Sequence, residues 1–174
     1  MTNKNPEIKA KIQPRIYSAN KIELQDAVPL TTPFSVHIDV CSYCNFKCSF
    51  CFQADVLGKK DKNFPHGMMT KELFKKTVDE LSEFPEKIKK IKFGNHGEPT
   101  MHKDLPFFID YARKSGVADI LEVFTNGSKL NPVLNRKLVD SGLQRINISL
   151  EGLTEERYLK VARAKINWES FVAN

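Results

Sequence analysis

Three closely spaced cysteines are the residues of this chain best suited to metal chemistry. Cys44, Cys48 and Cys51 lie in the segment CNFKCSFC, with the spacing C-x3-C-x2-C. Three thiolates held this close in one loop can bind three irons of a cubane [4Fe–4S] cluster, which leaves the fourth iron without a protein ligand. Because an open iron can take a ligand from outside the protein, the spacing indicates a reactive centre rather than an electron store.

A fourth cysteine, Cys41, leaves two other metal sites open. The four cysteines together read C-x2-C-x3-C-x2-C, a pattern that could bind structural zinc or complete a closed iron–sulfur site. Structural zinc sites usually join two cysteine pairs across a longer spacer, which this segment lacks. Cys41 directly follows a predicted strand, so we expect it to point away from the other three as a small buried apolar residue. We therefore favour the three-cysteine site.

The chain around the cysteines alternates strands with helices. Apolar and polar residues alternate over 34–40, as in a strand, and further strands are predicted near 91–93, 120–124 and 146–150. Helices are predicted over 70–84, 104–116, 131–142 and 154–162, and from 167 onward, with Leu73 among the buried residues of the first. This order predicts an α/β fold, a parallel partial (β/α) barrel with four βα units.

Unusual polar residues follow each of the four predicted strands. The cysteine segment follows the first strand. The motif HGEP follows the second strand, TNG lies at the end of the third and SLE at the end of the fourth. In parallel sheets and barrels, ligands bind at the carboxyl ends of the strands. We therefore expect one site built from these residues: Cys44, Cys48, Cys51, Gly97, Glu98, Thr125, Ser149 and Glu151.

These motifs resemble those of the radical S-adenosylmethionine (SAM) superfamily. The resemblance rests on CNFKCSFC, in which the aromatic Phe50 precedes the last cysteine, on HGEPT at 96–100, TNG at 125–127 and ISLEG at 148–152. It covers the chain from about Phe34 to its end. The stretch that leads into the cysteines, from VPLTTPF onward, is similar to the subgroup that often adds a C-terminal SPASM or twitch domain.

The resemblance implies a particular chemistry. Cys44, Cys48 and Cys51 would bind a [4Fe–4S] cluster whose open iron chelates the amino and carboxylate groups of SAM. Reductive cleavage of SAM would give a 5′-deoxyadenosyl radical that abstracts hydrogen from a substrate. The resemblance also implies an electron donor such as flavodoxin or ferredoxin. The substrate, a small molecule or a peptide, does not follow from the residues.

Six further residues are expected to bind SAM on the strength of this resemblance. Glu98 would accept hydrogen bonds from the methionyl ammonium, and Gly97 permits close backbone approach. Ser149, in preference to Thr125, would bind the carboxylate, Glu151 the ribose hydroxyls, and Phe50 would pack by the adenine. Each also has an ordinary alternative, such as a solvated loop carboxylate or a hydroxyl that caps a strand end. Asn126 has the alternative of a turn residue.

Composition narrows the partners and the compartment. The 174 residues carry 27 Lys and Arg against 21 Asp and Glu, a net charge of +6. These charges are scattered, which disfavours a nucleic-acid site, although a basic balance suits an anionic small molecule. No apolar stretch is long enough to span a membrane. The clustered cysteines disfavour a disulfide framework and no secretory leader is evident, so we expect a cytoplasmic protein.

The chain departs from the resemblance in its length. The usual core has six βα units and four are predicted here, so we expect a partial core domain over 34–174 after an N-terminal extension over 1–33. We expect the N-terminal part of a longer enzyme. The alternatives are an inactive fragment and a non-catalytic metal module that holds zinc or an electron-transfer cluster. His96 also stands where many members have a glycine.

Overall fold

The computed structural model describes residues 12, 23–53 and 66–174. The chain divides into two compact units, Met1–Leu30 and Thr31–Asn174. In the first unit the described residues form one short helix, α1 (Leu24–Ala27). The sequence of the N-terminal extension predicts at most a short strand, near Ile22–Leu24. This prediction is wrong at Leu24, where the segment LQDA is rich in helix formers and lacks β-branched residues. Ile22 lies outside the described residues.

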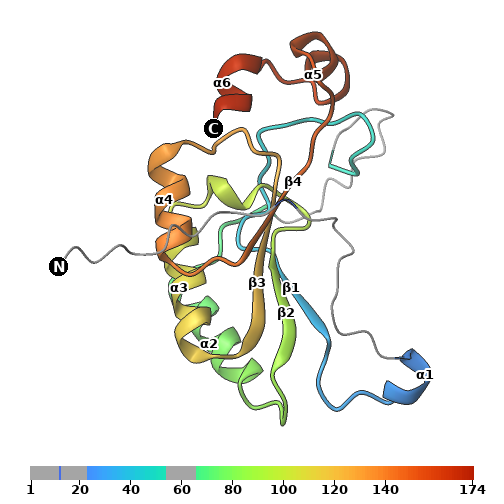
Figure 1. The fold of residues 1–174 in the computed structure, drawn as a ribbon, viewed down its shortest axis with the longest axis vertical. Helices are drawn as coiled ribbons and strands as arrows, with labels where there is room; N and C mark the ends of the chain where they lie inside the picture. The colour runs from blue at the N-terminus through green and yellow to red at the C-terminus, as the bar shows by residue number, and fades with distance from the viewer. Residues whose placement is uncertain (1–11, 13–22, 54–65) are drawn as a thin grey trace, which may run out of the picture. The chain divides into compact units, whose positions relative to one another are not determined.

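A four-stranded parallel sheet forms the frame of the second unit (Figure 1). Its strands are β1 (Ser35–Ile38), β2 (Ile88–Phe93), β3 (Ala118–Thr125) and β4 (Arg145–Ile148). They lie in chain order, and each neighbouring pair is parallel. The predicted α/β fold with four parallel strands is confirmed, and the carboxyl ends of all four strands share one edge.

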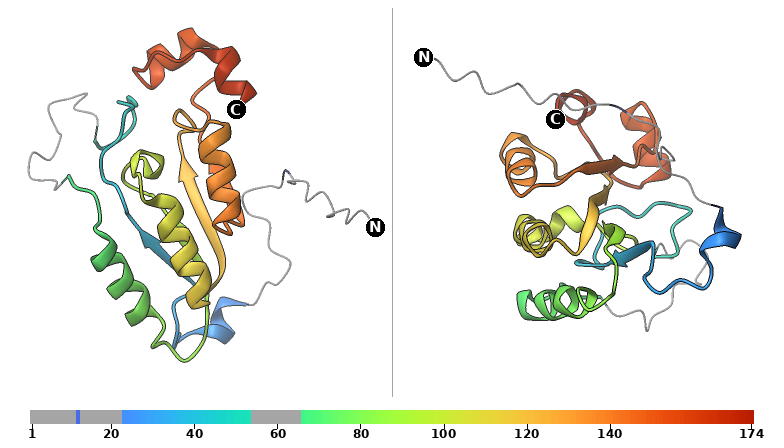
Figure 2. Two further views of the ribbon diagram at one scale, coloured as in Figure 1. Left: turned by 90° about the vertical axis from the view of Figure 1, so that its left-hand side faces the viewer. Right: turned by 60° about the horizontal axis from the view of Figure 1, so that its bottom comes forward.

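Three helices line one face of this sheet (Figure 2). They are α2 (Lys71–Leu81), α3 (Leu105–Ser115) and α4 (Pro132–Asp140). Two short helices, α5 (Glu155–Val161) and α6 (Trp168–Ala173), lie beyond the carboxyl edge of the strands, and a 3-10 turn, η1 (Pro99–Met101), follows β2. None of the three long helices covers the opposite face of the sheet.

The core lies between the sheet and its three long helices. Phe74 of α2 stacks on Phe108 of α3 and on Phe93 of β2, with ring centroids 4.4 and 6.0 Å apart. Leu73 is half exposed, contrary to prediction, because the buried side of α2 runs through Phe74 and Val78, four residues apart. Since strand side chains alternate between faces, the residues next to the buried ones in β2 and β3 point the other way.

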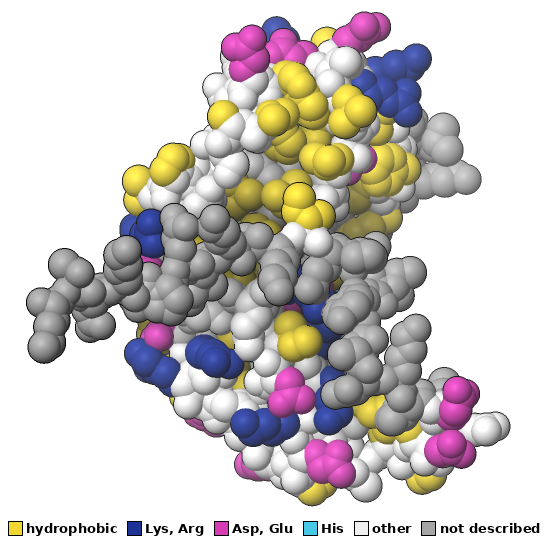
Figure 3. Space-filling view, in the orientation of Figure 1, with side chains coloured by type: hydrophobic (Ala, Val, Ile, Leu, Met, Phe, Trp, Pro, Cys, Tyr) yellow, Lys and Arg dark blue, Asp and Glu magenta, His cyan; other side chains and the backbone are white. Residues whose placement is uncertain are grey.

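The edge strand β4 is the least covered part of the sheet. Among the described residues it pairs only with β3, and Ile148 is 45% exposed. Apolar side chains gather on the neighbouring surface around α5 and α6 (Figure 3), where Leu150, Leu153 and Val172 are all more than half exposed. This surface adjoins the carboxyl edge at which the polar motifs lie.

Local sequence signals fix most helix ends. The Thr70 hydroxyl accepts a hydrogen bond from Leu73 N at 3.2 Å, as expected of an N-cap. Gly116 ends α3 with a φ of +67°, which suits glycine. Asp104 stands before α3 but makes no capping bond, because its carboxylate lies 3.0 Å from Lys71 Nζ instead. The predicted start of α3 is confirmed, but the Asp104 side chain forms an ion pair with Lys71 instead of capping the helix.

The cap of α4 provides a stability test. Asn131 Oδ1 accepts from Val133 N at 3.1 Å and from Leu134 N at 3.0 Å. We expect Asn131→Ala to lower the free energy of unfolding by about 1 kcal/mol, because both backbone donors lose their partner. Asn131→Asp keeps an acceptor and should stay close to the parent. Urea denaturation measures both, and equal losses in the two variants would contradict the capping role.

Candidate functional site

The four cysteines occupy two different environments. Cys41 is fully buried and its Sγ lies 3.5 Å from the Tyr43 carbonyl oxygen, whereas Cys44, Cys48 and Cys51 are each partly exposed in the loop after β1. Among the described residues no three His, Cys, Asp or Glu side chains already form a metal site. The loop thus offers three accessible thiols, and Cys41 makes its own contact elsewhere.

Burial makes the Cys44 and Cys48 thiols hold their protons. Desolvation, and then the Glu151 carboxylate and the other two thiols, raise the pKa of Cys48 to about 11. Desolvation also raises the pKa of Cys44, with a further contribution from Glu98. A metal cluster binds thiolates, so its positive irons would reverse this preference and release the protons. At Cys48 the two neighbouring thiols add to the rise, so the three sulfurs lie near enough to influence one another.

The back of the cysteine loop rests on α5 and the residue after it. Lys47 N donates to Ala162 O at 2.9 Å, and Ser49 N donates to Val161 O at 2.8 Å. The Phe46 ring meets Tyr158 edge-on, with centroids 6.0 Å apart, and both rings are buried. A small second core therefore fixes the loop from the side of the fourth βα unit.

Glu98 joins the loop after β2 to the end of β3. Its carboxylate is 1% exposed. Oε1 accepts from Thr125 Oγ1 at 2.6 Å, from Thr100 N at 3.0 Å and from the Thr100 hydroxyl, and Oε2 accepts from Asn126 N at 2.6 Å. Hydrogen bonds to a carboxylate are stronger than neutral ones, so this buried group connects two neighbouring strand ends.

Gly97 sits where two loops nearly touch. A Cβ at this position would lie 2.1 Å from the Cys41 carbonyl oxygen and 2.8 Å from the Ser42 backbone. The next residue, Glu98, donates its N–H to Tyr43 O at 2.8 Å. Glycine is therefore required for the loop after β2 to lie directly against the cysteine loop.

Asn126 links β3 to the cysteine loop, a contact that its turn-like TNG sequence does not reveal. Its Nδ2 lies 3.8 Å from Cys44 Sγ and donates to Asn45 Oδ1 at 3.0 Å. Its Oδ1 accepts from Ser128 N at 3.0 Å. Because a backbone N–H can only donate, this last bond fixes which end of the amide faces the sulfur.

The side chains of the remaining predicted residues lie around this centre and make no hydrogen bond to it within the described part of the chain. Ser149 is exposed, and its backbone N donates to Thr125 O at 2.9 Å. Glu151 N donates to the Tyr158 hydroxyl at 3.3 Å, and burial raises the pKa of the Glu151 carboxyl. Phe50 is 69% exposed. The structure thus brings Cys44, Glu98 and Thr125 into one bonded network and leaves these three side chains at its margin.

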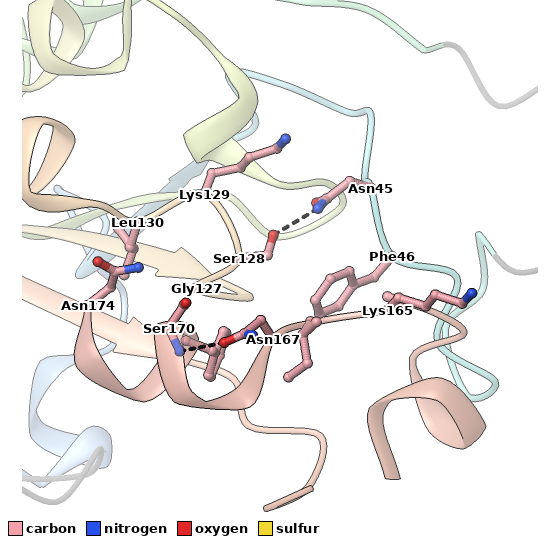
Figure 4. Close-up of a pocket in the computed structure, with 13 residues that line it drawn as sticks. Asn45, Phe46, Gly127, Ser128, Lys129, Leu130, Lys165, Asn167, Ser170 and Asn174 are labelled. Carbon is pink, nitrogen blue, oxygen red and sulfur yellow. Dashed lines mark hydrogen bonds between the residues drawn. The ribbon is translucent and has the colours of Figure 1, made fainter. Parts of the chain in front are cut away.

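A cavity of about 400 Å³ adjoins the cysteine loop (Figure 4). Asn45 and Phe46 form one wall, the residues after β3 another, and α6 with the segment before it the third. Asn45 Nδ2 donates to Ser128 Oγ at 2.8 Å, which joins two of the residues that line the cavity. None of the residues predicted to bind the cluster or SAM lines this cavity, so it is separate from the predicted site.

No helix in the described ranges is long and apolar enough to cross a membrane.

The chain belongs to the Radical SAM superfamily, whose family model matches residues 38–174. The family uses a [4Fe–4S] cluster and SAM for radical chemistry. Three partly exposed thiols in one loop, with the fourth cysteine buried elsewhere, fit a cluster with three protein ligands. The recognition made from the motifs is thereby confirmed.

Relatives and solved structures agree with this membership. The chain is 34% identical over 128 residues to a probable GTP 3′,8-cyclase of Methanococcus maripaludis and 36% identical over 112 residues to the Fe-coproporphyrin III synthase of Methanosarcina barkeri. These matches cover 73% and 64% of this chain but 39% and 26% of the relatives. The structure of BtrN in complex with AdoMet and 2-DOIA is similar, with 26% identity and a TM-score of 0.57 over 67% of this chain and 45% of that one.

The close approach at Gly97 yields a test of how the cysteine loop is held. We expect Gly97→Ala to push the loops apart, because a methyl group cannot lie 2.1 Å from a carbonyl oxygen. Overpacking of this kind costs about 1–3 kcal/mol, and iron bound after anaerobic reconstitution should fall several-fold. Gly67→Ala is the matched control: Gly67 N also bonds to Ser42, at 2.7 Å, yet a Cβ there meets nothing within 4 Å. Equal iron contents in the two variants would refute the packing argument.

Proposed function

We propose that this chain is part of a radical SAM enzyme that reductively cleaves SAM and directs a 5′-deoxyadenosyl radical to abstract hydrogen from a substrate. The observation that carries the proposal is the bonded network at the carboxyl edge. It joins Cys44 after β1, Glu98 after β2 and Thr125 with Asn126 at the end of β3. In the Radical SAM family the cluster ligands must lie next to the group that binds the ammonium of SAM, and this network would bring Cys44 and Glu98 together in that way.

Cys44, Cys48 and Cys51 would bind three irons of the cluster, while Cys41 stays in its buried position. When bound, the cluster and SAM together supply the electron and the carbon radical for the reaction. The protein's own share is to hold this pair in place and to keep water and stray donors away. Asn126 Nδ2 would donate toward the Cys44 thiolate, since the Ser128 backbone fixes the orientation of its amide.

Glu98 would bind the methionyl ammonium of SAM through Oε2. Among the described residues, Oε1 already accepts three hydrogen bonds, but Oε2 accepts only the one from Asn126 N, which leaves lone-pair capacity on that oxygen. Thr125 donates to Glu98 and accepts from Gly127 N at 3.0 Å, so its contribution would be to orient the carboxylate.

The marginal residues would hold the rest of SAM. Ser149 has an exposed hydroxyl suited to the SAM carboxylate, and Glu151 suits the ribose hydroxyls. The exposed Phe50 ring would lose water-accessible apolar surface by packing on the adenine. Gly97 would keep the loop after β2 close to the cysteine loop.

The printed names of the relatives support the shared radical step rather than one substrate. One relative is named for cyclisation of GTP and another for synthesis of Fe-coproporphyrin III. The chain covers well under half of either relative, so the activity of the whole protein belongs to this proposal. A reduced flavodoxin or ferredoxin would supply the electron.

Anaerobic reconstitution with iron and sulfide tests the proposal. We expect the chain to gain a brown iron–sulfur chromophore and, with SAM and dithionite, to release 5′-deoxyadenosine and methionine, measured by liquid chromatography. Cys48→Ala should lose both the chromophore and the product, since two thiolates cannot hold three irons. Cys41→Ala should keep both, because the Cys41 thiol already bonds to Tyr43 O.

Two results would count against this function. Loss of the chromophore in Cys41→Ala would point to a closed four-cysteine site. Tight binding of one zinc per chain without a chromophore would support a structural metal module instead. Metal analysis of both variants and the parent, prepared side by side, separates these outcomes.

A further inference from the structure

The face of the sheet that α2, α3 and α4 leave uncovered carries a row of charged residues. The strand register sets His37 of β1 opposite Lys92 of β2, Lys92 opposite Glu122 of β3, and Glu122 opposite Arg145 of β4. Residues opposite one another in neighbouring strands point to the same face. Four ionisable side chains from four strands therefore lie side by side across the sheet.

Glu122 is the centre of this row. Its carboxylate is 1% exposed, and Oε1 accepts from Asn147 Nδ2 at 2.6 Å. Oε2 accepts no hydrogen bond in the described part of the chain but lies 3.2 Å from Lys90 Nζ, and Arg145 Nη1 lies 3.7 Å from Oε1. A buried carboxylate needs a partner of opposite charge, and Lys90 supplies the closer of two such partners, with Arg145 as the other.

Lys92 adds positive charge that Glu122 does not require. Within the described ranges no carboxylate lies at ion-pair distance from its ammonium, which instead lies 5.7 Å from the centre of the Phe124 ring. Phe124 is two residues closer to the carboxyl edge than Glu122, the register partner of Lys92. The Lys92 side chain therefore leans toward the edge where the cysteine loop and Glu98 lie.

Asp39 is the other carboxylate near the row. Asp39, beyond β1, is engaged by His96, with Oδ2 2.6 Å from Nδ1. Desolvation, followed by the Lys92 ammonium, lowers the pKa of His37, while the carboxylates of Asp39 and Glu122 act in the opposite direction. Three cations thus share one buried carboxylate on this face.

We propose that this face binds an anionic group of the substrate, a carboxylate or a phosphate, with Lys92 as the direct contact and Arg145 as the second. The two residues flank Glu122, about 10 Å apart at the backbone because each strand spacing is roughly 4.8 Å, and both side chains are long enough to meet one group between them. The assignment rests on the proposed function, since the bound molecule is the substrate of that same site.

Lys90 and Asn147 have a different task in this arrangement. Lys90 neutralises Glu122, and Asn147 donates a hydrogen bond to it. Glu122 in turn holds the Arg145 guanidinium near this face, and because Lys90 already balances the carboxylate, the guanidinium charge can act on a ligand. Guanidinium presents paired donors that match the oxygens of carboxylate and phosphate, and ammonium acts as a point charge beside it.

The test is a binding titration on the reconstituted chain with SAM present and no reductant. Phenyl phosphate, benzoate and benzamide share one ring and differ in the head group, so they separate a phosphate site, a carboxylate site and simple ring binding. NMR or calorimetric titration should show at least one anion binding tenfold or more tightly than benzamide. Lys92→Gln should remove most of that advantage, and Lys92→Glu should abolish it.

Lys89→Gln is the matched control. It makes the same charge change three residues away in β2, where alternation turns the side chain to the other face and Asp119 lies 3.9 Å from Nζ. Thermal melts establish that all three variants fold. The proposal is overturned if neither anion exceeds benzamide, or if Lys92→Gln loses no more affinity than Lys89→Gln.

The two proposals fail separately. Release of 5′-deoxyadenosine without anion binding would remove the substrate assignment and leave the radical function intact. Anion binding that depends on Lys92 in a chain that never cleaves SAM would leave the binding face and remove the radical function.

Discussion

The buried carboxylate of Glu98 is the interaction on which the rest of the site depends. A charge that loses water must be compensated by hydrogen bonds, or burial costs several kcal/mol. Its donors come from Thr100 in the turn after β2 and from Thr125 and Asn126 at the end of β3. The Glu98 charge is therefore satisfied only when the ends of β2 and β3 are in register, so the geometry of the site depends on correct folding of the sheet.

The cysteine loop is held by elements far apart in the chain. Glu98 N bonds to Tyr43 O, the Asn126 amide reaches Asn45 and the Cys44 sulfur, and the end of α5 accepts from Lys47 and Ser49. Each contact comes from a different βα unit. The loop that we propose as the cluster site is therefore held in place by three different βα units, and a change at one of these contacts should shift the position of the thiols.

The sheet divides its two faces between stability and chemistry. One face buries aromatic and aliphatic side chains against three helices. The other presents Lys92, Glu122 and Arg145 in one row. Parallel strands make this division possible, because alternation sends every second residue to the same face while all four carboxyl ends meet at one edge.

The sequence by itself determined the order of strands and helices, most helix ends and the three-cysteine motif, because each depends on neighbours within a few residues. It misjudged the helix at Leu24, which the local helix formers favour, and the burial of Leu73, where the packing of Phe74 and Val78 decides which side of α2 is buried. The tertiary structure alone decided the contact of Asn126 with Cys44, the clearance at Gly97 and the row around Glu122. These depend on strand register and loop approach, which are set by contacts between residues 25 to more than 80 positions apart and leave no local mark on the chain.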